Sequence, residues 1–436
     1  MVIVTNGPKK EFRNTEKNNL FYLAIILPLF SGFGNVANTL VSLVELCILL
    51  YYIKSSRFYS LLPVFYIYYS QLKVLNIVFF NIYIVLAIMK FLLFERRSKK
   101  NGVVLGLFVL ILYAVIVLLL HDETWASILF LMQSIISLVV LMKVKENEST
   151  RKELKWVLVA ISISSMLYGV LFRNFIGAGN ATNSGEFSSG RYMGTKGDPN
   201  YMALYYCLSF AVVLFSGFKY NLVKWMLAII FFAGIALTGS ITALFVYAIT
   251  VLLYILFAKE SNITKKFIGV CGVIIAVILF IGYIQSDSDN IPILNMFKVR
   301  LLEKVKYWLA DDLSGFTTGR TELSQLYIDY FFKQNIFRIL FGGYQLNALA
   351  LKEEIFKVIG QAPHNTYVDV MLTCGLVGLV LFVVLLVKNI KNKVEKWRFN
   401  KTRENMSDIA MSIVAILFMF GLSLFPSAEY MFFLFF

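Results

Sequence analysis

The chain has little of the charge that soluble proteins carry. Of its 436 residues only 15% are charged, and 59% are hydrophobic. Soluble domains carry about a quarter charged and about half apolar residues. This shortage of charge excludes an ordinary soluble domain and predicts a polytopic membrane protein. Backbone polar groups cannot stay unpaired in lipid, so we expect its apolar runs to be helices and the fold class to be all-α.

Metal-binding and redox residues are also scarce. There are only two histidines, His121 and His364, which excludes a histidine-rich metal site. The few cysteines lie within apolar runs, which indicates buried thiols and no disulfide framework. They are Cys47, Cys207, Cys271 and Cys374. The G-x-G-x-x-G, Walker and H-E-x-x-H patterns are missing from the chain. We therefore expect neither a metal nor a cofactor.

Acidic residues are outnumbered, with 26 Asp and Glu against 41 Lys and Arg. The basic residues gather in short clusters between apolar runs, as they do in the cytoplasmic loops of membrane proteins. The excess of positive charge therefore does not indicate nucleic acid. Counting spans between the clusters puts all of them on one side of the membrane. The clusters are the N-terminal tail, Lys54 with Arg57, and residues 96–100, 143–155, 219–224, 259–266 and 388–403.

The apolar runs predict about 12 to 14 spanning helices, since a span needs about 20 apolar residues. The expected spans are Leu20–Phe33, Val36–Ile53, Phe58–Leu72, Val74–Phe94, Val103–Leu120, Thr124–Met142, Trp156–Phe172, Pro199–Gly217, Leu222–Leu237, Ser240–Ala258, Phe267–Gln285, Thr366–Val387 and Asp408–Leu424, with Pro426–Phe436 as a short further one.

Four regions follow from these spans. Residues 1–155 form N-terminal transmembrane helices, and residues 156–285 form central helices with an external loop at 173–198. Residues 286–365 form a large external loop, and residues 366–436 form the C-terminal helices.

The large external loop is expected to contain amphipathic helices. One is predicted over Met296–Leu309. A second starts near Thr318 or Thr321 and ends at Gly342-Gly343. Its apolar stripe has helical spacing and comprises Leu323, Leu326, Tyr327, Tyr330 and Phe331. Two placements stay open, on the outer membrane surface or packed on the bundle as a lid.

Two external arginines precede helix starts. Arg191 lies in a glycine-containing loop that leads to Asp198 and Pro199, an expected N-cap and first helical residue. Arg320 lies where the large loop becomes helical. Free N–H groups at a helix start favour anions, and arginine binds phosphate with two hydrogen bonds. Both are candidate anion-binding residues, and the alternative is that each is a surface arginine beside a capped helix.

His364 is the candidate base. It follows Pro363 and precedes Asn365, an expected cap of the span that begins at Thr366. A histidine at a helix N-terminus feels the positive end of the dipole and stays neutral, the form that a general base needs. The alternative is an interfacial histidine without a role. His121, between two spans, is interpreted as part of a polar turn.

Other ionisable residues give weaker signals. Asp287-Ser288-Asp289 resembles the D-x-D of nucleotide-sugar glycosyltransferases, but it falls on the side that lacks nucleotide sugars. Glu45, Lys73 and Glu429 lie in or near spans, where charges are often functional, yet they have no evident partner in the sequence.

Three ordered pieces of the second half resemble the superfamily of O-antigen ligases and polysaccharide polymerases of bacterial envelopes. The first is Arg191-x-x-Gly194 followed by Asp198-Pro199-Asn200 at a helix start. The second is Thr318-Gly319-Arg320. The third is Pro363-His364-Asn365-Thr366 leading into Cys374-Gly375-Leu376-Val377-Gly378.

The resemblance implies glycosyl transfer from a polyprenyl-pyrophosphate donor, without metal or nucleotide sugar, at the external face of the bacterial cytoplasmic membrane. It implies that Arg191 and Arg320 bind undecaprenyl pyrophosphate and that His364 takes the proton of the acceptor hydroxyl. Its partners would be the lipid-linked glycan, membrane lipid and other assembly proteins of envelope polysaccharides such as capsule.

The chain departs from the family pattern in two places. Where many members carry Ser-Arg, this chain has Ser240-Ile241-Thr242, and the Gly-x-Gly turn of the loop is Gly342-Gly343-Tyr344. A polymerase that joins oligosaccharide repeat units is the leading interpretation. The alternatives are a ligase that passes glycan to a lipid or protein acceptor, a transporter of polysaccharide or lipid-linked oligosaccharide, and a structural scaffold.

Overall fold

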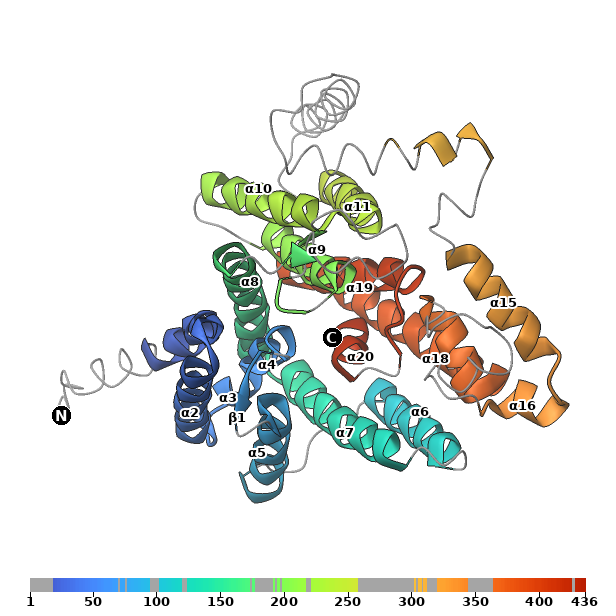
Figure 1. The fold of residues 1–436 in the computed structure, drawn as a ribbon, viewed down its shortest axis with the longest axis horizontal. Coiled ribbons are helices and arrows are strands. Elements are labelled where there is room, and N and C mark those ends of the chain that lie inside the picture. The colour runs from blue at the N-terminus through green and yellow to red at the C-terminus, as the bar shows by residue number, and fades with distance from the viewer. Residues whose placement is uncertain are drawn as a thin grey trace.

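The structure is a computed structural model. It describes residues 19–69, 71–74, 77–94, 102–119, 124–172, 175–176, 191–192, 194–196, 198–216, 221–257, 302, 305–307, 309–311, 320–343, 364–425 and 428–436. This part of the chain is all-α apart from two short hairpins, as the sequence predicts (Figure 1). The hairpins pair β1 (Lys73–Val74) with β2 (Ile77–Val78), and β3 (Phe175–Ile176) with β4 (Arg191–Tyr192), both antiparallel.

The first half of the chain contributes one 3₁₀ helix and seven labelled α-helices. They are η1 (Leu27–Phe33), α2 (Asn35–Tyr52), α3 (Arg57–Ser60), α4 (Leu62–Ile67), α5 (Phe79–Phe94), α6 (Gly102–Leu119), α7 (Thr124–Glu146) and α8 (Glu148–Leu171). The second half contributes α9 (Pro199–Phe215), α10 (Asn221–Thr238), α11 (Ile241–Phe257), α15 (Arg320–Phe332), α16 (Ile336–Phe341), α18 (Thr366–Phe399), α19 (Arg403–Met419) and α20 (Ala428–Phe435).

Helix α9 is the centre of the bundle. Every residue of it except Tyr201 is buried, and it packs against α8, α10, α11 and α19 (Figure 1). A helix that is apolar all round is stable only where neighbours cover all of its faces. Because Asp198 caps its N-terminus, the central helix also fixes the position of that carboxylate.

Three described helices are long and apolar enough to cross a membrane. They are Asn35–Tyr52, Glu148–Leu171 and Thr366–Phe399, and several described apolar helices are shorter. The length and composition of these three helices indicate a membrane protein. The predicted span Phe267–Gln285 and the loop helix Met296–Leu309 lie wholly or mostly outside the described residues.

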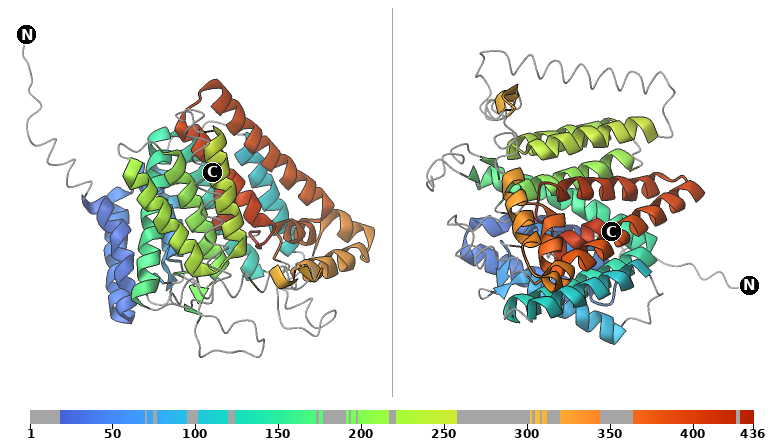
Figure 2. Two further views of the ribbon diagram at one scale, coloured as in Figure 1. Left: turned by 90° about the horizontal axis from the view of Figure 1, so that it is seen from above. Right: turned by 90° about the vertical axis from the view of Figure 1, so that its right-hand side faces the viewer.

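Two basic clusters that the sequence places on one side meet in space. Arg151 and Lys155 of α8 bind the two carboxylate oxygens of Asp408 in α19, at 3.1 and 2.6 Å. Lys393 of α18 donates to the Ser412 hydroxyl, one turn further along α19. We call this the basic end of the bundle. In Figure 2 (left) the α18–α19 connection lies at this end, and β3–β4 and α15–α16 lie toward the opposite one.

Two local predictions were wrong. The expected span Phe58–Leu72 is two short helices, α3 and α4, whose residues are buried almost throughout except Arg57. Pro63 lies in the first turn of α4. It has no backbone N–H to donate to the preceding turn, so α3 does not continue through it as one helix. The loop helix predicted to reach Gly342 is broken into α15 and α16, because Asn335 caps a new helix by accepting from the Arg338 N–H at 3.0 Å.

Candidate functional site

Three helix starts meet at the end of the bundle opposite the basic end. The Asp198 side chain accepts the backbone N–H groups of Asn200 and Tyr201, at 2.6 and 3.4 Å, at the start of α9. Arg320 is the first residue of α15. His364 directly precedes Asn365, whose side chain caps α18. Both caps predicted from the sequence are confirmed.

A short segment after α19, residues 421–424, joins these helices. We call it the junction segment. Its first three carbonyl oxygens accept one hydrogen bond each, from Arg320 Nη1 at 2.9 Å, Thr366 Oγ1 at 2.7 Å and the Tyr201 hydroxyl at 2.8 Å. These donors come from α15, α18 and α9, so the segment sets the relative positions of all three helix starts.

The imidazole of His364 lies in the electric field of Arg320 and Asp198. Burial lowers the pKa of His364, and the positive charge of Arg320 lowers it further, while the negative charge of Asp198 opposes them. The sequence predicted the same direction from the helix dipole; here the causes are desolvation and a nearby cation. This lowered pKa favours the uncharged imidazole at neutral pH.

The ring nitrogen Nδ1 of His364 has no hydrogen-bond partner among the described residues, and it is closed to solvent. The residue itself has φ of 51°, a left-handed conformation that few non-glycine residues adopt. An unpaired buried nitrogen is costly. Strain and an unsatisfied polar atom at the same residue are typical of functional sites.

Arg320 is half-buried and donates to the Gly421 carbonyl. Burial lowers the pKa of the Arg320 guanidinium, and the negative charge of Asp198 opposes this shift. An arginine remains protonated at neutral pH even so. The site therefore combines a guanidinium, a carboxylate and a neutral imidazole that come from distant parts of the chain.

Arg191, the second arginine predicted from the sequence, lies in β4, where it is the register partner of Ile176. Its side chain lies outside the described part of the structure. The residues that follow are firmly anchored. The Thr195 hydroxyl donates to the Ile67 carbonyl at 2.6 Å and is hydrogen bonded to the Ser165 hydroxyl at 2.8 Å.

Lys196 anchors the same loop by a buried ion pair. Its ammonium lies 2.5 Å from Glu429 Oε1 and donates to the Tyr66 carbonyl at 2.6 Å. Burial lowers the pKa of Lys196, and the Glu429 carboxylate opposes that shift. The rings of Tyr205 and Tyr430 lie within about 6 Å of the ammonium. Glu429, which had no partner in the sequence, thus ties α20 to the loop that carries Arg191 and Asp198.

The remaining candidates lie elsewhere. Glu45 is fully buried in α2, and neither carboxylate oxygen has a hydrogen-bond partner among the described residues. Lys73 is exposed in β1. His121 and Asp287-Ser288-Asp289 lie outside the described residues. Within the described part, no three His, Cys, Asp or Glu side chains are grouped to hold a metal ion.

Thr242 belongs to the tripeptide that departs from the family pattern, and both Thr242 and Arg320 lie close to Gly421 of the junction segment. A Cβ added to Gly421 would lie 3.4 Å from Thr242 Oγ1 and 3.7 Å from Arg320 Nη1.

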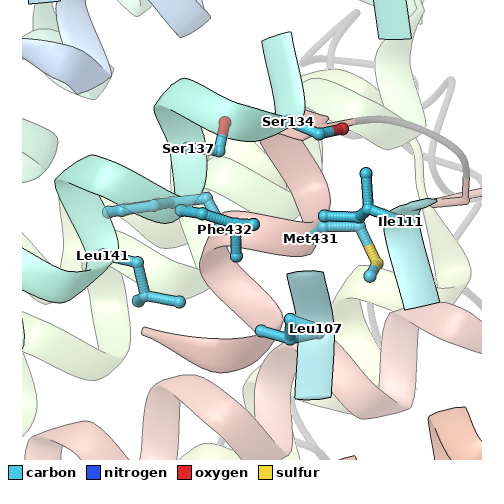
Figure 3. Close-up of a pocket in the computed structure, with 8 residues that line it drawn as sticks. Leu107, Ile111, Ser134, Ser137, Leu141, Met431 and Phe432 are labelled. Carbon is cyan, nitrogen blue, oxygen red and sulfur yellow. The ribbon is translucent and has the colours of Figure 1, made fainter. Parts of the chain in front are cut away.

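A small cavity lies between α6, α7 and α20 (Figure 3). Its volume is about 10 Å³, which suits a single water. The buried Ser134 hydroxyl on its wall has no hydrogen-bond partner among the described residues. His364, Arg320 and Asp198 do not line this cavity, and it is too small for a sugar or a lipid headgroup.

Sequence reasoning missed three parts of this site. It gave Asp198 only a capping role, although its charge acts on both Arg320 and His364. It left Lys196 and Glu429 unpaired. It gave no role to the junction segment, which contributes backbone carbonyls and thus carries no side-chain signal. No protein-family model matches the chain, and a search of curated proteins finds no significant match.

Proposed function

We propose that this protein is a multi-pass glycosyltransferase of the bacterial cytoplasmic membrane. It polymerises undecaprenyl-pyrophosphate-linked oligosaccharide repeat units at the external face, without a metal or nucleotide sugar. The observation that carries the proposal is that His364 and Arg320 lie in each other's electric field at one end of the bundle, with a lowered pKa of His364 and an Nδ1 atom that has no hydrogen-bond partner among the described residues. The ordered motifs around Arg191, Arg320 and His364 support the same reaction class.

The roles follow from the chemistry of the leaving group. The acceptor hydroxyl oxygen bonds to the anomeric carbon, and the bond from that carbon to the pyrophosphate oxygen breaks. The hydroxyl proton goes to His364, and the charge that develops on the pyrophosphate is stabilised by Arg320 and Arg191. Fixed cations in a site with little water stabilise such charge strongly, and a positioned base contributes about 10²–10⁴-fold.

Asp198 acts as a positioning residue, because its negative charge acts on both Arg320 and His364.

The deciding experiment is glycan chain length in cells that carry His364→Ala, with protein level in the membrane measured alongside. We expect single lipid-linked units to accumulate and long glycan to vanish. The matched control is His121→Ala, which removes the other histidine and should leave polymer intact. Unchanged glycan in His364→Ala cells would reject the catalytic role of this residue.

The same assay distinguishes the ligase alternative. A ligase uses the same donor and base but passes finished glycan to a lipid or protein acceptor. In that case long polymer would persist on its carrier lipid and would be missing from the acceptor.

A transporter of lipid-linked oligosaccharide is the second candidate. It is favoured by the break in α18 at Gly375 and by the buried, unpartnered Glu45, since broken helices and intramembrane charges are typical of transporters. A transporter would be more sensitive to Glu45→Gln than to His364→Ala, whereas the proposed enzyme would show the reverse order.

A further inference from the structure

Helix α16 presents an unusually apolar face. Ile336 is 60% exposed, Phe337 73% and Phe341 46%. Two basic residues, Lys333 and Arg338, are exposed beside them. Large contiguous apolar side chains next to exposed cations are typical of a segment that lies at a membrane surface.

Helix α15 is apolar on two sides, of which one is buried and the other exposed. Tyr327 and Phe331 turn inward and form a small core with Val368, Met371 and Leu372 of α18. Leu326, which the predicted stripe placed inside, is 45% exposed. The loop helices therefore pack on the bundle with one side, as the lid alternative requires, and leave another apolar side open.

Helix α16 is fixed against the break in α18. The Gly343 N–H donates to the Thr373 carbonyl at 3.2 Å. Tyr113 of α6 donates to the Phe341 carbonyl at 2.6 Å and lies 3.0 Å from the Cys374 carbonyl. Gly375, with φ of 64°, forms the break itself. The position of α16 along α18 is thus defined by several contacts.

The exposed apolar surface of α18 begins at this break. Residues 366–375 are buried except for the half-buried Tyr367. Beyond the break, exposed valines follow one another at helical spacing, at Val377, Val380, Val384 and Val387. The exposed residues of α16 therefore lie next to the point on α18 where its exposed apolar band begins.

The apolar band has a defined length. From Gly375 to Lys388, the first exposed lysine of the basic cluster 388–403, are 13 positions (388 − 375). At about 1.5 Å per residue this is roughly 20 Å, which the apolar side chains of α16 extend toward the hydrocarbon thickness of about 30 Å. If the basic end marks the inner boundary, α16 lies at the outer one.

We infer that α16 is an interfacial helix that inserts Ile336, Phe337 and Phe341 into the outer edge of the lipid bilayer. Lys333 and Arg338 lie among the lipid phosphates. The occupant of this face is lipid, because α16 adjoins the start of the valine band and carries exposed cations that complement phosphate. The inference rests on the membrane location in the proposed function and is independent of the glycosyl transfer.

Photo-crosslinking in membranes of expressing cells tests the inference. A benzoyl-phenylalanine replaces Phe337 in the full chain, and the matched control replaces Glu322, an exposed residue on the polar side of α15. We expect lipid adducts at position 337 at several times the yield at position 322. Because Phe337 is mostly exposed, the replacement is compatible with folding; Ile336 provides a second position.

Two results would overturn the inference. One is an adduct between position 337 and another protein, which would make the face a protein interface. The other is a lipid yield no higher than at position 322. Repeating the measurement with His364→Ala separates this question from the enzymatic one, since lipid contact should persist in a variant that makes no polymer.

Discussion

Arg320 at the start of α15 lies close enough to His364, just before α18, for its positive charge to lower the pKa of His364. The same guanidinium is tethered to the Gly421 carbonyl at 2.9 Å. A cation that helps to hold a neighbouring imidazole neutral suits both a pyrophosphate site and a proton acceptor. Each role can be tested through the titration of His364.

The pH dependence of the reaction should follow the lowered pKa of His364. Neutral imidazole is the active form, so kcat/KM should be constant near neutral pH and fall only below the ordinary histidine value of about 6.5. Measuring polymerisation in proteoliposomes between about pH 5 and 8 checks this range. An acid limb with its midpoint above the ordinary value would contradict the burial of this group.

Protein stability should change over the same range and with a defined sign. The unfolded chain binds a proton to His364 more readily than the folded protein does, because the folded pKa is lowered. The contribution of His364 therefore destabilises the fold as pH falls through the ordinary histidine value, and it is unchanged above that value. Thermal unfolding in detergent measures it, with His364→Gln as the variant that lacks this dependence.

Two single charge removals should shift the acid limb in opposite directions. Arg320→Gln removes a positive charge and should raise the pKa of His364, which moves the limb to higher pH. Asp198→Asn removes a negative charge and should move it to lower pH, while asparagine still caps α9. Shifts in the same direction would show that the two residues do not act on His364 by their charge.

The buried pair Lys196–Glu429 should be essential for stability and tolerant of joint replacement. Lys196→Met leaves an unpaired buried carboxylate and should cost about 3–5 kcal/mol of unfolding free energy. Combining it with Glu429→Met removes both charges and should recover most of that loss. Thermal unfolding of the purified variants measures the cycle, and additive losses would contradict a direct interaction.

Gly375→Ala should destabilise the protein more than Gly34→Ala. Both glycines have positive φ, so each substitution carries a backbone cost of about 1–3 kcal/mol. A Cβ on Gly375 would also collide with the Leu340 carbonyl and the Gly342 nitrogen, whereas nothing lies within 4 Å of one on Gly34. Equal changes in Tm would show that α16 does not pack tightly at the break in α18.

Local signals were strong enough to predict much of the helical structure. The caps at Asp198 and Asn365 form as expected, because a side-chain oxygen and the N–H groups it accepts are near neighbours in the chain. The break at Asn335 was missed because the apolar spacing continues past it. The span predicted over Phe58–Leu72 failed because hydrophobicity alone does not distinguish a spanning helix from short buried ones.

The sequence by itself determined the all-α character of the described chain and the helix starts at Asp198 and Asn365. It also supplied the arginines and the histidine on which the proposed function rests. Only the tertiary structure decided which helix ends meet. It brought Asp198 to Arg320 and His364, paired Lys196 with Glu429, and set α16 against the break at Gly375. Sequence patterns report contacts within a few residues, whereas these contacts form between distant segments that are held by backbone carbonyls, which every residue has.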